Sequence, residues 1–174
     1  MPLFYREGDA TQAVADESAP GPRVIAHICN DVGGWGAGFV LALSRRWPEP
    51  ERAYRHWYAE RTNAAPEADP AQINEPRPFA LGEIQLVEVE AELSVVNMIA
   101  QRDVRSVAGR PPIRYDALQR CLRLLAREAD GRGASVHMPR IGCGLAGGTW
   151  DEVGRLVDTE LVAADVDVYV YDFR

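Results

Sequence analysis

The sequence predicts an α/β fold, a three-layer α/β/α sandwich in which helices cover both faces of a sheet of about six strands. Two observations carry this prediction. Apolar stretches of strand length alternate along the chain with stretches of helical periodicity, and two glycine-rich segments each join a strand to a helix. With 174 residues, 47% of them hydrophobic, the chain suits one core and is too short for two ordinary domains. We therefore expect a single domain over residues 1–174.

The first half of the chain predicts two strands followed by two helices. In order, these are strands at 3–7 and 23–29, a helix that stops at Pro48, and a second helix over about 49–61. The 23–29 run is mostly apolar, which indicates a central strand buried on both faces. Val40, Leu43 and Trp47 recur three to four residues apart, as one face of a helix does. Residues 12–22 are polar and contain Pro and Gly, so we expect a loop there.

The second half predicts four strands and two helices. The expected segments are a loop at 62–79, strands at 82–90 and 93–100, a loop at 101–112, a helix from Pro111-Pro112 to Gly131 and Gly133, a strand at 134–138, a helix after Thr149, and a strand at 166–173. The third helix carries an apolar stripe from Tyr115 to Ala129. Thr149 and Glu152 fit a capping box at the start of the last helix.

The charge of the chain excludes several classes of function. All 19 basic residues are arginine, so a mechanism that needs lysine is excluded. A net charge of −7 argues against nucleic-acid binding, because that requires a basic face. Three histidines and three cysteines show no metal-ligand spacing, and we expect neither a metal nor a cofactor. No membrane span, signal peptide or disulfide framework is evident. We expect a cytoplasmic protein that does not bind membranes, and we assume a monomer.

Two segments share the order strand, glycine-rich loop, helix. The first loop is 30–38 and the second is 142–148. In open α/β sheets, ligands bind beyond the carboxyl ends of the strands, where such loops gather. Glycine lets backbone approach a phosphate closely, and the start of a helix presents unpaired N–H groups to an anion. Two such loops at one sheet edge could hold a diphosphate without lysine. The segments match neither the GxGxxG fingerprint nor a Walker A loop.

The residues around both loops resemble a known family. The run Val24 to Asp31, with Gly34-Trp35-Gly36-Ala37-Gly38, looks like the first ligand loop of macrodomains, and Met138 to Leu145 is similar to their second loop. Residues 8–11 look like the early segment that recognises adenine in that family. The second loop is most similar to the branch that contains terminal ADP-ribose protein glycohydrolase. The resemblance implies a mixed sheet, ADP-ribose as ligand, and mono-ADP-ribosylated proteins as partners.

The resemblance also implies roles for individual residues. Asp9 would accept a hydrogen bond from the adenine amino group, and Asn30 would contact the distal ribose. The implied ligand-binding residues are Asp9, Ala10, Asn30, Gly34, Trp35, Gly36, Ala37, Gly38, Gln101, Ile141, Gly142, Cys143, Gly144, Leu145, Ala146, Tyr171 and Asp172. Trp35 either shields the distal ribose or packs over the loop, and the sequence leaves both readings open.

Two departures separate the chain from that glycohydrolase branch. Its catalytic lysine would fall at about Gln101 or Arg102, and its catalytic aspartate would fall at Ala146. None of these side chains can take part in the lysine adduct with the opened ribose. A similar fold therefore does not transfer that mechanism.

Hydrolysis by activated water remains open to this chain. We expect hydrolysis of the ester between ADP-ribose and glutamate or aspartate side chains, with Asn30 and Asp31 as candidate catalytic residues. Asp31 is a candidate general base, and a loop carboxylate that accepts turn hydrogen bonds is an equal reading. The substrate's own phosphate could instead activate the water, as other macrodomains suggest. A His27–Cys29 nucleophile is conceivable, but both side chains share one strand face, where buried, inert residues are expected.

Two alternatives to this reaction stay open. One is a non-catalytic ADP-ribose reader, favoured by the missing lysine and aspartate. The other is a hydrolase of a free ADP-ribose derivative, either the 1″-phosphate or the O-acetyl ester.

Overall fold

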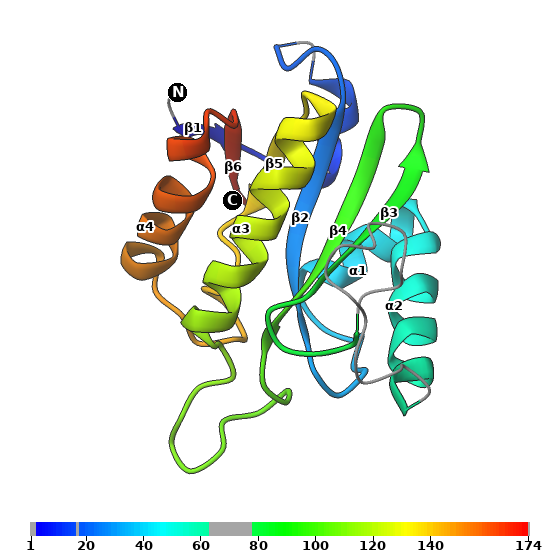
Figure 1. Ribbon diagram of the computed structural model, residues 1–174, viewed down its shortest axis with the longest axis vertical. Helices are drawn as coiled ribbons and strands as arrows, with labels where there is room; N and C mark the ends of the chain where they lie inside the picture. The colour runs from blue at the N-terminus through cyan, green and yellow to red at the C-terminus, as the bar shows by residue number, and fades with distance from the viewer. Residues whose placement is uncertain (1–2, 17, 63–77, 174) are drawn as a thin grey trace.

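The computed structural model describes residues 3–16, 18–62 and 78–173, which form a mixed six-stranded sheet between two layers of helices (Figure 1). Its elements are β1 Leu3–Glu7, η1 Ala10–Ala15, β2 Arg23–Asn30, α1 Phe39–Arg46, α2 Glu49–Ala59, η2 Glu60–Thr62, β3 Ile84–Glu90, β4 Leu93–Gln101, α3 Tyr115–Arg132, β5 Ser135–Pro139, α4 Trp150–Glu160, η3 Val162–Ala164 and β6 Val168–Asp172. The predicted α/β/α sandwich is confirmed.

The strand order is β1-β6-β5-β2-β4-β3. Every neighbouring pair is parallel except β3 and β4, which are joined at Ala91-Glu92 and run antiparallel. The two strands that precede the glycine-rich loops, β2 and β5, are therefore parallel neighbours in the middle of the sheet. Both loops consequently leave the sheet at the same edge.

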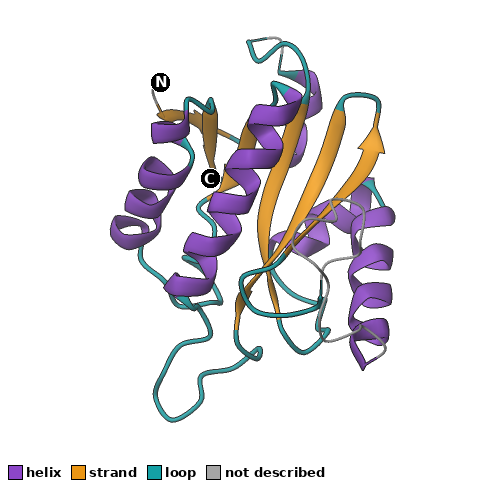
Figure 2. Cartoon of the chain, viewed as in Figure 1, coloured by secondary structure: helices purple, strands orange, loops and turns teal. Residues whose placement is uncertain are grey.

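Helices cover the two faces of the sheet separately (Figure 2). The core cluster that contains α3 and α4 also contains Val24 and Ala26 of β2. The cluster that contains α1 and α2 instead holds Ile25 and Cys29 of the same strand. Successive side chains of a strand point to opposite faces, so β2 is buried on both sides, as its apolar sequence predicted.

The predicted start of the third helix is wrong. The helix α3 begins at Tyr115, because the backbone before it pairs with the end of β4: Pro112 accepts from the N–H of Arg102 at 2.8 Å, and the N–H of Arg114 donates to Ala100 at 2.9 Å. Its end is set by Gly133, which has φ +61° in the left-handed C-cap position, whereas the other proposed end marker, Gly131, lies inside the helix.

Two further local expectations need correction. Part of the predicted loop 12–22 is the 3₁₀ helix η1, whose N-cap Asp9 accepts a hydrogen bond from the N–H of Thr11 at 2.8 Å. Thr149 is the N-cap of α4 as predicted, but its side chain makes no capping hydrogen bond. The predicted loop 62–79 lies almost wholly outside the described residues.

The sheet has an irregularity beside the first glycine-rich loop. Cys29 pairs with Ile99, whereas Asn30 pairs with Gln101, so Ala100 is an extra residue in β4. Such a bulge re-aims the side chains that follow it. Among the described helices, none is long and apolar enough to cross a membrane.

Candidate functional site

The candidate site lies beyond the carboxyl ends of β2 and β5. After β2 the chain enters α1 on one face of the sheet, and after β5 it enters α4 on the other (Figure 1). Neighbouring parallel strands whose connections diverge in this way leave a crevice between their loops, the usual ligand position in open α/β sheets. The loops approach each other, because a Cβ added to Gly38 would lie 3.6 Å from Cδ1 of Leu145.

Asn30 organises the first loop. Its side chain is 7% exposed, and its Oδ1 accepts hydrogen bonds from the N–H groups of Val32 and Gly34 and from the Tyr54 hydroxyl, at 3.1, 2.9 and 2.8 Å. Its Nδ2 donates to the carbonyl of Gly34 at 2.8 Å. The amide carries two N–H groups, so one remains for a ligand such as the expected distal ribose.

Tyr54 is a supporting residue that was not among the residues predicted from the sequence. This side chain is fully buried in α2, and its hydroxyl also lies 2.7 Å from the carbonyl of Asn30. Burial raises the pKa of the Tyr54 phenol, so it remains a neutral donor. An aromatic residue at helical spacing predicts only a core position, so the sequence carried no signal for this role.

The Trp35 side chain packs into the protein interior. The indole is 8% exposed and packs edge-on against His27, with ring centroids 5.3 Å apart. Its Nε1 donates to the Ser44 hydroxyl at 2.8 Å, and that hydroxyl donates to Glu51 at 3.0 Å. These contacts match the reading in which Trp35 packs against its own loop.

Asp31 and Gln101 tie the first loop to the segment after β4. Oδ1 of Asp31 accepts from the N–H of Asp103 at 2.7 Å, and its Oδ2 lies 3.9 Å from Nη1 of Arg102. Nε2 of Gln101 donates to the carbonyl of Asp103 at 3.3 Å. These contacts match the reading of Asp31 as a loop acceptor, and they engage the carboxylate that was a candidate general base.

The second loop is folded by its own backbone. The N–H groups of Ile141, Cys143, Gly147 and Gly148 donate to carbonyls within residues 139–144. Gly142 has φ +73°, and a Cβ there would lie 2.6 Å from Cδ1 of Ile113, so both conformation and space require glycine. The carbonyl of Ala146 accepts from the N–H of Ile113 at 3.0 Å, which connects this loop to the segment before α3.

The two loops leave a set of backbone donors unused. Within the described residues, no acceptor is recorded for several of these N–H groups, among them those of Trp35, Gly36, Ala37, Gly38, Gly144, Leu145 and Ala146. The helix α1 follows directly, with Gly38 as an N-cap that supplies no side-chain hydrogen bond. Unpaired amides and a helix start favour an anion. The arrangement can thus hold a diphosphate without a cationic side chain.

The residues expected around adenine are brought to the adjoining edge of the sheet. Glu7 of β1 pairs with Asp172 of β6, and Gly8 donates its N–H to the carbonyl of Asp172 at 3.0 Å. The Asp172 carboxylate is bound on both oxygens by the Arg140 guanidinium, which lowers its pKa. The Tyr171 hydroxyl lies 2.8 Å from Nδ1 of His137, and the side chain is 6% exposed.

Most side chains expected to contact adenine are buried or already have partners within the protein. The Asp9 carboxylate is half-buried and already accepts from the N–H of Thr11 through Oδ1, whereas Ala10 is buried. The side chains of Tyr171 and Asp172 have partners within the protein. A ligand at this edge would therefore meet backbone and the second carboxylate oxygen of Asp9.

His27 and Cys29 lie on one face of β2, as expected, and both are buried. Nε2 of His27 donates to Oδ1 of Asn97 at 2.6 Å, and burial lowers the pKa of His27 to about 4. Burial raises the pKa of the Cys29 thiol. A neutral thiol beside a neutral imidazole is not an activated nucleophile.

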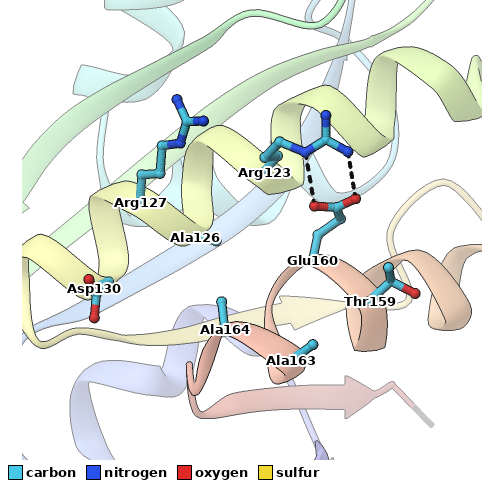
Figure 3. A pocket seen from close by; sticks show the side chains of 8 residues that line it. All are labelled: Arg123, Ala126, Arg127, Asp130, Thr159, Glu160, Ala163 and Ala164. Atoms are coloured by element: carbon cyan, nitrogen blue, oxygen red, sulfur yellow. Dashed lines mark hydrogen bonds and ion pairs between the residues drawn. The ribbon is translucent and has the colours of Figure 1, made fainter.

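Two hollows in the described surface lie away from this edge. One, of about 360 Å³, lies between α3 and α4, where Arg123 and Glu160 form a paired contact near Arg127 and Thr159 (Figure 3). The other, of about 280 Å³, lies near Pro20 at the amino ends of the strands. The described residues include no cluster of three or more His, Cys, Asp or Glu that could hold a metal.

Comparison with family models finds no match. Solved structures do match over nearly the whole chain. This chain is 47% identical to a protein of unknown function from Bacteroides thetaiotaomicron, with a TM-score of 0.84 over 99% of this chain and 98% of that one. It is 43% identical to a macrodomain protein from Streptomyces coelicolor, with a TM-score of 0.79 over 98% and 99% of the two chains.

Curated proteins match at lower identity. Chromodomain-helicase-DNA-binding protein 1-like of Mus musculus is 28% identical over 172 residues, covering 98% of this chain. The chain spans only 18% of that protein's length and 16% of its Danio rerio counterpart. ADP-ribose 1″-phosphate phosphatase of Lodderomyces elongisporus is 25% identical over 181 residues, covering 99% of this chain and all (100%) of the phosphatase.

Proposed function

Since the chain belongs to the macrodomain family, we propose that it binds ADP-ribose between its two glycine-rich loops and hydrolyses an ADP-ribosyl bond. The observation that carries the proposal is the set of N–H groups with no recorded acceptor in both loops, which follow neighbouring parallel strands at one end of the sheet. The name of one relative, ADP-ribose 1″-phosphate phosphatase, supports the same ligand class. We take residues 1–174 as one such domain and place it in the cytoplasm.

The proposed substrate is the ester between ADP-ribose and a glutamate or aspartate side chain of a modified protein. A carboxylate is a good leaving group, so the reaction needs a positioned substrate and one activated water. The water oxygen bonds to C1″ of the distal ribose while the bond from C1″ to the carboxylate oxygen breaks. The carboxylate leaves with the bonding electron pair, and the water loses a proton.

We assign acceptance of that proton to the substrate's diphosphate. Asp31 is less suited, because both carboxylate oxygens have partners within the protein: Oδ1 accepts from the N–H of Asp103, and Oδ2 lies 3.9 Å from the Arg102 guanidinium. Asn30 would orient the distal ribose through its remaining Nδ2–H. At the positions of the lysine and aspartate of the glycohydrolase branch, Gln101 or Arg102 and Ala146 cannot replace those groups.

The experiment measures release of ADP-ribose from a glutamate-modified protein, together with calorimetric binding of free ADP-ribose. Besides Asn30→Ala, the sharpest variant is Gly144→Glu, because a Cβ at Gly144 meets nothing within 4 Å and the new carboxylate would repel a diphosphate. The matched control is Gly131→Glu, which also has open space but lies on α3. We expect Gly144→Glu to lose binding and release by tenfold or more, and the control to retain both.

The outcomes separate the alternatives. Binding without release from the modified protein would favour a reader, and release of phosphate from ADP-ribose 1″-phosphate alone would favour the phosphatase reading that the fungal relative suggests. No binding by the wild type, or equal binding by Gly144→Glu, would contradict the proposed site.

A further inference from the structure

The segment between β4 and α3 forms an ordered arm, residues 102–114. Its base is closed by hydrogen bonds from Arg102 to Pro112 and from Arg114 to Ala100. Its tip is closed by two reciprocal backbone hydrogen bonds between Val107 and Arg110, at 3.1 and 3.0 Å. The two residues between them, 108 and 109, have φ of +51° and +74°, as in the tight turns that join β-hairpins. In Figure 1 the arm extends beyond the carboxyl end of the sheet.

The arm contacts both glycine-rich loops. At its start, Asp103 donates its N–H to Asp31, and a Cβ on Gly34 would lie 3.1 Å from Cγ1 of Val104. At its end, a Cβ on Gly147 would lie 2.7 Å from Cβ of Pro111. The arm therefore borders the proposed ADP-ribose site on both sides, where the protein attached to the ribose must approach.

The arm is basic in an acidic chain. It carries four arginines and one aspartate, although the whole chain has a net charge of −7. Arg114 is turned back onto carbonyls at the base of the arm, and Arg102 lies near Asp31. Arg105 and Arg110 are exposed, and within the described residues neither guanidinium has a recorded partner.

We propose that this arm is the docking surface for an acidic polypeptide segment that flanks the modified carboxylate. An acidic segment would be repelled by the rest of the molecule, so a local cluster of arginines is what allows its approach. Arginine binds carboxylates through two parallel hydrogen bonds. Val104 and Val107, 49% and 55% exposed, add apolar contact for a peptide. This inference rests on the proposed function.

The arm fits a peptide better than a nucleic acid. Single-stranded nucleic acids bind to surfaces that combine basic residues with aromatic rings on which bases stack. Residues 102–114 contain no aromatic side chain. Exposed valines beside arginines instead match the apolar and acidic side chains of a polypeptide.

The test compares two synthetic peptides that carry ADP-ribose on one glutamate, one flanked by Asp and Glu and the other by Asn and Gln. We expect the wild type at low salt to show a kcat/KM at least tenfold higher for the acidic peptide, mainly through KM. Arg105→Gln combined with Arg110→Gln should abolish this preference while the affinity for free ADP-ribose stays unchanged. Arg127→Gln, an exposed arginine on α3, is the matched control and should keep the preference (Figure 3).

Other outcomes would overturn the inference. Equal kcat/KM for the two peptides, or preference for an ADP-ribosylated single-stranded oligonucleotide, would exclude an acidic peptide as the partner. Loss of free ADP-ribose binding in the double variant would make the arm part of the nucleotide site. If neither peptide is cleaved, their binding still decides: tighter binding of the acidic peptide supports docking even though the proposed hydrolysis has failed.

Discussion

Most hydrogen bonds of the Asn30 side chain are made to residues of its own loop. Three donors converge on its Oδ1, and one of them, the Tyr54 hydroxyl, comes from α2 and not from the loop. The position and orientation of the remaining Nδ2–H therefore depend on a fully buried residue of another element. Tyr54 is in this sense a positioning residue for the site.

We expect Tyr54→Phe to weaken the site without unfolding the protein. The change removes one hydroxyl and should lower the free energy of unfolding by about 1 kcal/mol, the usual value of a buried hydrogen bond. Asn30 keeps its two backbone donors, so the loop should persist with a less constrained amide. Turnover should fall about tenfold with a smaller change in KM, as measured by ADP-ribose release and urea unfolding.

The matched control is Tyr58→Phe in the same helix. No hydrogen bond from the Tyr58 hydroxyl is recorded among the described residues, and its ring packs beneath Gly33. A loss of kcat as large in Tyr58→Phe as in Tyr54→Phe would show that the effect comes from packing of α2 and not from the Asn30 contact.

At the scale of elements, two central strands each bury a histidine. His27 in β2 is 2% exposed and His137 in β5 is fully buried, and burial lowers the pKa of each to about 4. An unfolded histidine has a pKa near 6.5, so between about pH 4 and 6.5 the unfolded chain binds more protons than the folded one. The free energy of unfolding should therefore rise with pH across this window.

The expected slope is roughly 1.4 kcal/mol per pH unit for each histidine, approached in the middle of the window. Stability from this source is fully present above pH 6.5 and is lost as the pH falls towards 4. Urea unfolding at pH 7.5, 6.0 and 5.0 measures it, and His27→Gln should reduce the slope by about half. The variant for comparison is His56→Gln, which changes an exposed histidine. A urea concentration at the unfolding midpoint that stays the same from pH 7.5 to 5.0 would contradict this account.

At the scale of the whole molecule, the distribution of charge predicts different salt dependence for the binding of free ADP-ribose and of acidic peptides. The unused donors at the proposed nucleotide site are backbone amides, and the chain around them has a net charge of −7. Salt screens long-range repulsion between this chain and an anionic ligand. We expect the Kd for free ADP-ribose to change by less than about threefold between 0.05 and 0.5 M NaCl, or to decrease.

The Kd for acidic modified peptides should instead increase with salt concentration, because their proposed contacts are exposed arginines of the arm and salt screens this attraction. Calorimetry with free ADP-ribose and with the acidic modified peptide, at both salt concentrations, makes the comparison within one protein. Tenfold weaker binding of free ADP-ribose at high salt would indicate that a cationic side chain holds the diphosphate after all.

Much of this fold can be predicted from local sequence. The apolar stretch at 23–29 identified a central strand, the stretch at 93–100 identified another strand, and the spacing of Val40, Leu43 and Trp47 identified α1, because periodicity reports which faces are buried. Boundaries were less certain where long-range pairing competes with local preference. Pro111-Pro112 resembles a helix start, but backbone pairing with the end of β4 keeps those residues outside α3.

By itself, the sequence determined the sandwich architecture, the absence of lysine chemistry and the two glycine-rich loops at strand ends. Only the tertiary structure decided that β2 and β5 are neighbours, that Tyr54 supports Asn30, that Trp35 packs against its own loop, and that the arm at 102–114 contacts both loops. Periodicity and turn chemistry act over a few residues and can be read along the chain. Pairings between distant segments depend on strand order and on side chains meeting in three dimensions, which local sequence does not encode.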